Sequence, residues 1–215
     1  MEKEEIRESY RVVLEGGQGE ITEKKSRFIA TVRAVTTEEE AVAFLNEMKK
    51  KYWDASHNCS AFVIGRKAEL TRCSDDGEPS GTAGRPMLEV LLAEGIRNTA
   101  VVVTRYFGGT LLGTGGLVRA YSAAVKAGLE ASRLGTMRFG TRLLVETDYN
   151  GAGKIQYILG QKKITPDHTV YTDRVQIQVT LPGEMTDGFK KEVTEATGAK
   201  AVMTELESLY FVDKS

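Results

Sequence analysis

The feature that most constrains the fold is the stretch from Thr99 to Ser132, where a buried-strand pattern runs through a glycine-rich loop into an amphipathic helix. Five of the nine residues from Gly108 to Gly116 are glycine. Such a loop is typical of backbone that approaches a partner closely or adopts positive φ. We expect the helix to begin near Gly116, so that its unpaired N–H groups and the positive end of its dipole stabilise an anion.

Two known phosphate-binding loops do not fit this segment. Gly108 and Gly113 have the glycine spacing of a P-loop, but Thr114 and Gly115 stand where lysine and serine or threonine are needed. A dinucleotide-binding fingerprint fails because Val118 occupies the place of its third glycine. The glycines therefore indicate either an anion site of another kind or a loop that only lets the helix pack tightly on its strand.

A second loop, residues 72–86, precedes an expected helix at residues 87–94. It carries three carboxylates, Asp75, Asp76 and Glu78, which could hold a hard cation or act as acid and base. The other interpretation is a solvated acidic turn in which an aspartate bonds its own backbone. Because each loop follows a strand and precedes a helix of one small domain, we expect the two loops to lie side by side.

His57 opens an apolar strand whose hairpin partner leads into the acidic loop. It could act together with a carboxylate of that loop, but we favour a histidine hydrogen-bonded at the edge of a strand. Cys59 lies in the same strand and is expected to be a small core residue. The sequence contains no CxxC or HExxH motif, and we predict neither a metal nor a cofactor.

Three segments carry a resemblance to a known family: HNCSAFVIG at residues 57–65, SDDGEPSGTAGRPML at residues 74–88, and VVVTRYFGGTLLGTGGLVRAYS at residues 101–122. In order and spacing they are similar to the YigZ/IMPACT family. The resemblance implies a ribosomal protein S5 domain 2-like fold for the first domain and a ferredoxin-like fold for the second. It also implies regulation of translation through protein partners in eukaryotic members, and a function in translation or RNA binding in bacterial members.

Composition narrows the classes of partner. The chain has 215 residues, 29 of them basic and 30 acidic, so any RNA contact must come from a local patch rather than from a strongly basic domain. No apolar run is long enough to span a membrane, and the charged start MEKEEIRESY is not a signal peptide. Two cysteines fit a reducing compartment, and we expect a cytoplasmic protein that does not bind membranes.

Hydrophobic periodicity predicts two α+β domains, residues 1–134 and residues 135–215. In the first, a capping box at Thr37 and Glu40 starts a helix, and all helices are expected on one face of the sheet. In the second, the order is βαββαβ, the ferredoxin-like plait, with a polar sheet face at Gln176 and Gln178. Residues 133–135 are the expected linker.

The predicted elements of the first domain are strands at residues 10–14, 26–35, 57–64, 70–73 and 99–105, and helices from Thr37 and at residues 87–94 and 116–133. Those of the second domain are strands at residues 141–149, 164–171, 174–181 and 200–212, and helices at residues 151–159 and 183–197.

Two functions follow from these motifs. The first is a non-enzymatic, translation-associated regulator that binds RNA, the ribosome or a translation-related protein. Its expected anion- or nucleic-acid-binding residues are Arg85, Arg105, Tyr106, Gly108, Gly109, Thr114, Gly115, Gly116 and Arg119. The second is a small hydrolase or phosphate-ester enzyme, in which a metal or an activated water works at Asp75, Asp76, Glu78 and His57. Because no convincing pair of nucleophile and base is present, binding is favoured over catalysis.

Overall fold

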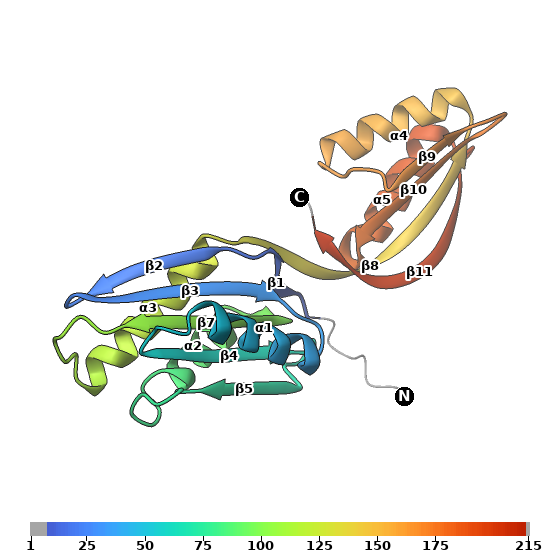
Figure 1. Cartoon of the computed structure of the whole chain (residues 1–215). Helices are drawn as coiled ribbons and strands as arrows, with labels where there is room; N and C mark the ends of the chain where they lie inside the picture. The colour runs from blue at the N-terminus through green and yellow to red at the C-terminus, as the bar shows by residue number, and fades with distance from the viewer. Residues whose placement is uncertain (1–7, 214–215) are drawn as a thin grey trace. The chain divides into compact units, whose positions relative to one another are not determined.

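The computed structural model describes residues 8–213 (Figure 1). They form two compact units, and the division between them follows Gly135. This division falls inside a single strand, β8 (Arg133–Thr147). The predicted linker, residues 133–135, is thus the first part of a strand that continues into the second unit. Leu134 packs against the core of the first unit, and a Cβ on Gly135 would lie 2.7 Å from Cδ1 of Leu14.

The first unit is built on a five-stranded antiparallel sheet with the order β2-β3-β7-β4-β5. Its strands are β2 (Gln18–Glu23), β3 (Ser26–Ala34), β7 (Thr99–Tyr106), β4 (His57–Ile64) and β5 (Leu70–Ser74). A separate strand, β1 (Tyr10–Glu15), pairs in parallel with the short β6 (Ile96–Arg97). The central strand β7 is the continuous apolar run of the sequence, and it is buried along almost its whole length.

Helices cover both faces of this sheet (Figure 1). The helices α2 (Gly84–Ala93) and α3 (Thr114–Glu130) pack on the face that carries Val101 and Val103, whereas α1 (Glu38–Lys51) packs on the face that carries Ala100 and Val102. The expectation that all helices lie on one face is wrong. A strand that is apolar at both alternating sets of positions must be covered on both sides, and β7 is such a strand.

The predicted capping box of α1 is present. The side chain of Thr37 accepts a hydrogen bond from the backbone N–H of Glu40, with a donor–acceptor distance of 3.2 Å. The carboxylate of Glu40 reaches back to the backbone N–H of Thr36, at 2.6 Å, which is one residue before the cap itself. Two backbone donors at the start of the helix are thus satisfied by side chains.

The second unit contains, in chain order, β8, α4 (Tyr149–Gln161), β9 (His168–Tyr171), β10 (Val175–Pro182), α5 (Gly183–Thr197) and β11 (Val202–Asp213). The predicted βαββαβ order is therefore observed. Within this unit the sheet order is β11-β8-β10-β9.

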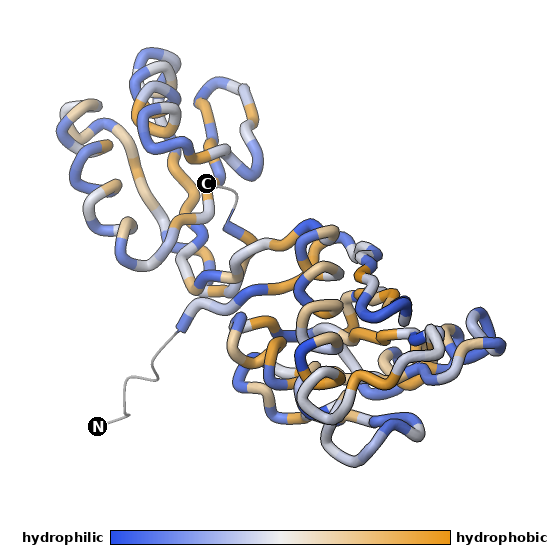
Figure 2. Tube along the Cα trace, turned by 90° about the vertical axis from the view of Figure 1, so that its left-hand side faces the viewer, coloured by the Kyte–Doolittle hydropathy of each residue, from blue (hydrophilic) through white to orange (hydrophobic). Residues whose placement is uncertain are grey.

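Apolar residues of α4 and α5 pack with alternate residues of β8 and β10, such as Val145 and Ile177, to form the core of this unit. Figure 2 shows hydrophobic residues concentrated along the interior strands and hydrophilic residues in the connections. The predicted polar positions are half-buried, and Gln176 donates a hydrogen bond from Nε2 to the carboxylate of Glu146. The other sheet face of this unit is thus polar at these positions.

Two helical glycines differ in the space around them, and this predicts opposite effects of the same substitution. A Cβ on Gly128 in α3 would lie 2.9 Å from Cβ of Ala30 in β3, whereas a Cβ on Gly188 in α5 would meet no atom within 4 Å. Alanine should improve helix propensity at both positions by about 1 kcal/mol. We expect Gly188→Ala to raise the free energy of unfolding and Gly128→Ala to lower it by about 1–3 kcal/mol, because α3 must move off the sheet. Urea denaturation followed by circular dichroism measures both, and equal stabilisation would contradict the close approach.

Candidate functional site

The acidic loop and the glycine-rich loop line one pocket of about 440 Å³. Glu78 and Pro79 come from the first loop, and Phe107 and Leu111 come from the second. His57 joins them because it begins β4. The expected side-by-side placement of the two loops is therefore observed. It follows from the sheet register, which pairs His57 of β4 with the last residues of β7.

Asp75 holds the acidic loop against the start of α2. Its Oδ1 accepts hydrogen bonds from the backbone N–H groups of Ala83 (3.0 Å) and Gly84 (2.8 Å), and its Oδ2 accepts one from Gly81 (2.8 Å). Burial acts to raise the pKa of Asp75, but these three donors outweigh it and hold the pKa below its usual range. For Asp75, the structure therefore agrees with the second interpretation given above, an aspartate of a turn that accepts hydrogen bonds from the nearby backbone.

Asp76 positions His57. One carboxylate oxygen of Asp76 accepts a hydrogen bond from the backbone N–H of Asn58 (2.7 Å), and the other accepts one from Nζ of Lys49 (2.7 Å). The Asp76 carbonyl oxygen lies 2.9 Å from Nδ1 of His57, with the Asp76 backbone at a φ of 44°. Both aspartates are thus engaged within the fold. Among residues 8–213, no three His, Cys, Asp or Glu side chains are grouped so as to hold a metal ion.

Glu78 is buried, and it is the acidic-loop carboxylate that faces the pocket. Its Oε1 accepts hydrogen bonds from Nη1 of Arg105 (2.6 Å) and from the hydroxyl of Tyr121 (2.7 Å). The Cys59 thiol lies 3.3 Å from that hydroxyl and 2.9 Å from the carbonyl oxygen of Asp75. Burial raises the pKa of Cys59 to about 12, so this thiol stays protonated at neutral pH. Its expected role as a core residue fits these contacts.

Tyr121 is the residue of this network that the sequence analysis missed. It is fully buried on the face of α3 that packs on the sheet, and its ring meets that of Phe28 edge-on at 5.2 Å. Burial raises the pKa of its hydroxyl far above the usual range. An aromatic residue on an apolar helix face is normally a core residue, so the sequence carries no sign that its hydroxyl reaches a buried carboxylate.

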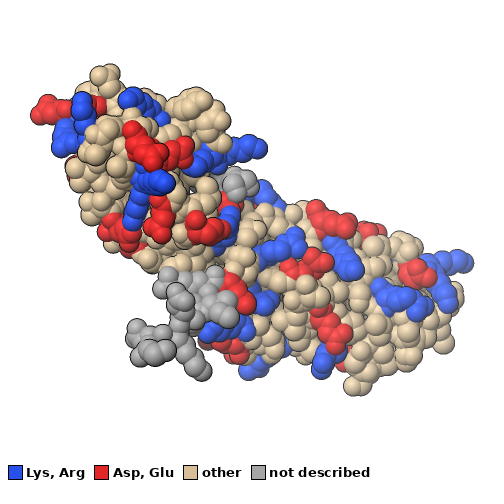
Figure 3. All heavy atoms as spheres, turned by 180° about the vertical axis from the view of Figure 1, so that it is seen from behind, with Lys and Arg blue, Asp and Glu red and all other residues tan. Residues whose placement is uncertain are grey.

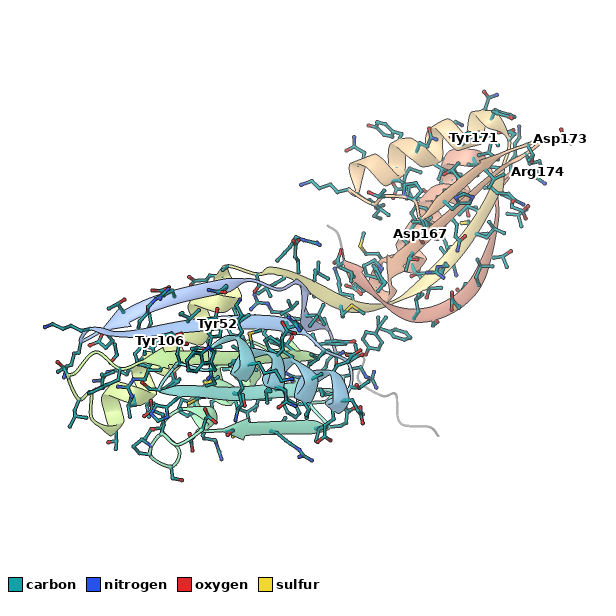
Figure 4. All side chains as sticks on the ribbon, viewed as in Figure 1. Tyr52, Tyr106, Asp167, Tyr171, Asp173 and Arg174 are labelled. Atoms are coloured by element: carbon teal, nitrogen blue, oxygen red, sulfur yellow. The ribbon has the colours of Figure 1, made fainter. Side chains whose placement is uncertain are left out.

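Three residues that were expected to bind an anion are engaged in contacts within the protein. Arg105 is 5% exposed, and its charge is compensated by Glu78. Tyr106 lies on the opposite face of the sheet, where its hydroxyl donates to Asp54 (3.0 Å); Figure 4 labels it beside Tyr52, where α1 ends. Arg85 is exposed on α2 and pairs with Glu89. Neither Tyr106 nor Arg85 lines the pocket.

The glycines of the loop serve different purposes. A Cβ on Gly108 would lie 2.0 Å from the backbone of Lys25, so this glycine permits a close approach within the protein. Gly109 and Gly113 have φ values of 81° and 73°, which favour glycine. The helix begins at Thr114 rather than near Gly116, because the N–H of Leu117 already bonds the carbonyl of Gly113 (3.0 Å).

The start of α3 combines unpaired backbone N–H groups with an arginine that has no counter-charge among the described residues. No side chain caps this helix, so its first N–H groups, on Thr114, Gly115 and Gly116, point outward without a side-chain acceptor. A Cβ on Gly115 would lie 3.6 Å from Nη1 of Arg119, which places this guanidinium beside the helix terminus. Arg119 is exposed and makes no ion pair with any residue in the range 8–213.

Comparisons with known proteins identify the family. A family model described as the Impact N-terminal domain matches residues 24–129, and one described as a domain of unknown function (DUF1949) matches residues 145–200. The IMPACT family member YvyE of Bacillus subtilis is 41% identical to this chain, over 94% of the chain and 93% of YvyE. The chain belongs to the IMPACT family. The resemblance found in the sequence is thereby confirmed.

Other IMPACT proteins match to different extents. YigZ of Escherichia coli is 37% identical over 80% of this chain and 85% of its own length. The IMPACT homologue of Saccharomyces cerevisiae is 39% identical over 98 residues, which are 43% of this chain and 37% of the yeast protein. A crystal structure of a protein described only as hypothetical has a TM-score of 0.58 and 32% identity, covering 93% of this chain and 98% of its own. No helix within residues 8–213 is long and apolar enough to cross a membrane.

The buried ion pair predicts a large loss of stability when one partner is removed. Glu78→Ala leaves the Arg105 guanidinium buried without its counter-charge, and we expect the free energy of unfolding to fall by about 3 kcal/mol. Arg85→Ala removes an ion pair whose side chains are 70% and 62% exposed, and we expect a change within about 0.5 kcal/mol. Urea denaturation compares the two variants. Similar small effects would show that the pair is not buried in solution.

The lowered pKa of Asp75 predicts a pH-dependent contribution to stability. Because the folded state favours the ionised carboxyl, the contribution is complete above about pH 5 and decreases as the pH falls through the folded-state pKa. We expect Asp75→Asn to lower the free energy of unfolding by about 1–2 kcal/mol at neutral pH, and by progressively less on acidification. Urea midpoints at several pH values test this. A difference that does not change with pH would contradict the role of the charge.

Proposed function

We propose that this chain is a non-enzymatic, translation-associated regulator that binds RNA phosphate at the start of α3. The observation that carries the proposal is an uncapped helix terminus with the unpaired guanidinium of Arg119 beside it. Oriented N–H groups and a nearby arginine are a common arrangement for binding phosphate. The Phe107 ring is 49% exposed beside the same terminus and offers a face on which a base can stack.

The charge distribution supports a small contact rather than an extended one. Figure 3 shows Lys and Arg side chains interspersed with Asp and Glu on the face that it displays. The formal net charge of −1 agrees with this mixture. Binding to the ribosome or to a structured RNA should therefore depend on a few positioned phosphate contacts, whose strength falls with salt concentration.

The hydrolase hypothesis receives less support from the contacts of its residues. Asp75 and Asp76 accept hydrogen bonds on both carboxylate oxygens, and Glu78 is paired with a buried arginine. The thiol of Cys59 is buried, and its pKa is raised to about 12, which does not suit a nucleophile. Binding therefore remains the favoured function.

The proposal extends to fold and location. We infer an S5 domain 2-like fold for the first unit from the family resemblance. For the second unit we infer a ferredoxin-like fold, supported by its element order and by the sheet order β11-β8-β10-β9. A translation regulator would act in the cytoplasm. In the second unit, the polar sheet face at Gln176 and Gln178 offers a second contact with the RNA.

A carboxylate placed at the helix start tests the proposal. In Gly115→Asp the new side chain pairs with Arg119 and competes with phosphate for the N–H groups, while an acidic residue in the first turn favours the helix itself. We expect at least about tenfold weaker binding to ribosomes or to a labelled RNA at low salt, with stability unchanged or raised. Fluorescence anisotropy and co-sedimentation measure the binding at about 50 and about 200 mM salt.

Gly188→Asp is the matched control, because it makes the same charge change on α5, where the side chain meets open space. We expect this control to bind RNA as the unmodified chain does. Equal binding by the Gly115→Asp variant, or binding that does not weaken with salt, would contradict the proposed phosphate site.

A further inference from the structure

Two hydrogen-bond acceptors face each other in the pocket. The carbonyl of Asp76 can only accept, so the proton of the neutral His57 ring lies on Nδ1 and the lone pair lies on Nε2. This Nε2 lies 3.9 Å from Oε2 of Glu78. The Arg105 and Tyr121 donors both go to Oε1, and no residue in the range 8–213 donates a hydrogen bond to Oε2.

The separation of these acceptors indicates what they bind. A distance of 3.9 Å is too long for a hydrogen bond, and two acceptors have no proton to share. A single atom that carries two hydrogens, such as a primary amino nitrogen, can donate one to each. Because Glu78 is already neutralised by Arg105, the pair suits a neutral amino group better than a cation.

The rest of the pocket restricts the body of the ligand. Its walls are mainly apolar and include Pro79, Phe107, Leu111 and Leu117. Its volume of about 440 Å³ falls in the range of small-molecule sites. Thr114, the first residue of α3, lines the same pocket, so a ligand with its amino group at His57 and Glu78 can extend toward the helix N-terminus.

We propose that this pocket binds a nucleotide whose base carries an amino group at position 6 of a purine or at position 4 of a pyrimidine, namely adenine or cytosine. The amino group donates to Nε2 of His57 and Oε2 of Glu78, the base lies against Phe107, and the phosphate lies at the start of α3. Uracil and hypoxanthine present an oxygen at the corresponding position, which would face two acceptors. The inference rests on the proposed RNA binding and names the base that the site selects.

Matched nucleotides test the selection. AMP and IMP differ in the group at position 6 of the purine, and CMP and UMP differ in the group at position 4 of the pyrimidine. We expect the full chain to bind AMP at least about tenfold more tightly than IMP, and CMP more tightly than UMP, because the oxo group leaves the two acceptors of the pocket unpaired. Isothermal titration calorimetry at about pH 8 measures the affinities of all four nucleotides. Equal affinities within both pairs would overturn the proposal.

Two variants at His57 separate recognition from folding. His57→Asn can keep a donor near the Nδ1 position for the carbonyl of Asp76 but lacks an acceptor at the Nε2 position, and we expect it to lose the preference for AMP over IMP. His57→Gln can still place an acceptor near the Nε2 position, and we expect it to keep part of the preference. Circular dichroism confirms that each variant is folded. An unchanged preference in His57→Asn would overturn the assignment.

Binding of RNA distinguishes this proposal from the one on which it rests. If a labelled RNA binds in a salt-dependent way but the chain distinguishes neither AMP from IMP nor CMP from UMP, the base selection is wrong and the phosphate site stands. If the chain binds neither RNA nor any of the four nucleotides, both the phosphate site and the base selection are wrong.

Discussion

The buried ion pair between Arg105 and Glu78 is the interaction on which the arrangement of the two loops depends. Burying two charges is unfavourable unless the geometry is good and the remaining polar atoms are satisfied. Here the pair has a separation of 2.6 Å and the Tyr121 hydroxyl donates to the same carboxylate oxygen, whereas the buried Nε of Arg105 has no hydrogen-bond partner among the described residues. The three residues come from β7, the acidic loop and α3, so the pair fastens this loop onto the sheet and helix that carry the glycine-rich loop.

The same pair gives the pocket its polar character. Both internal donors go to Oε1 of Glu78, which leaves Oε2 directed toward His57. The orientation of His57 is set in turn by Asp76, whose own carboxylate is held by Asn58 and Lys49. Asp76 thus supports His57, while Arg105 and Tyr121 hold Glu78, so that two acceptors are fixed in a pocket with mainly apolar walls.

Most of the fold could be predicted from the sequence, because hydrophobic periodicity and helix caps are local signals. The strand His57–Ile64 and the helix Gly183–Thr197 have the predicted bounds. The errors concern interactions between elements. Both faces of β7 are covered by helices, which its unbroken apolar run already indicated. The contact between Tyr121 and Glu78 spans 43 residues of sequence and has no local signal.

The two arginines beside the glycine-rich loop show how position within an element decides which charge stays exposed. Arg105 has the same parity along β7 as Val101 and Val103, so its side chain enters the buried side of the sheet and must find a counter-charge there. Arg119 lies on α3 between Leu117 and Ala120, which are buried, but it projects to the exposed side of the helix. Sequence proximity to the loop made both residues candidates for binding an anion. Only the arginine on the exposed side of its element keeps a charge that is available to a ligand.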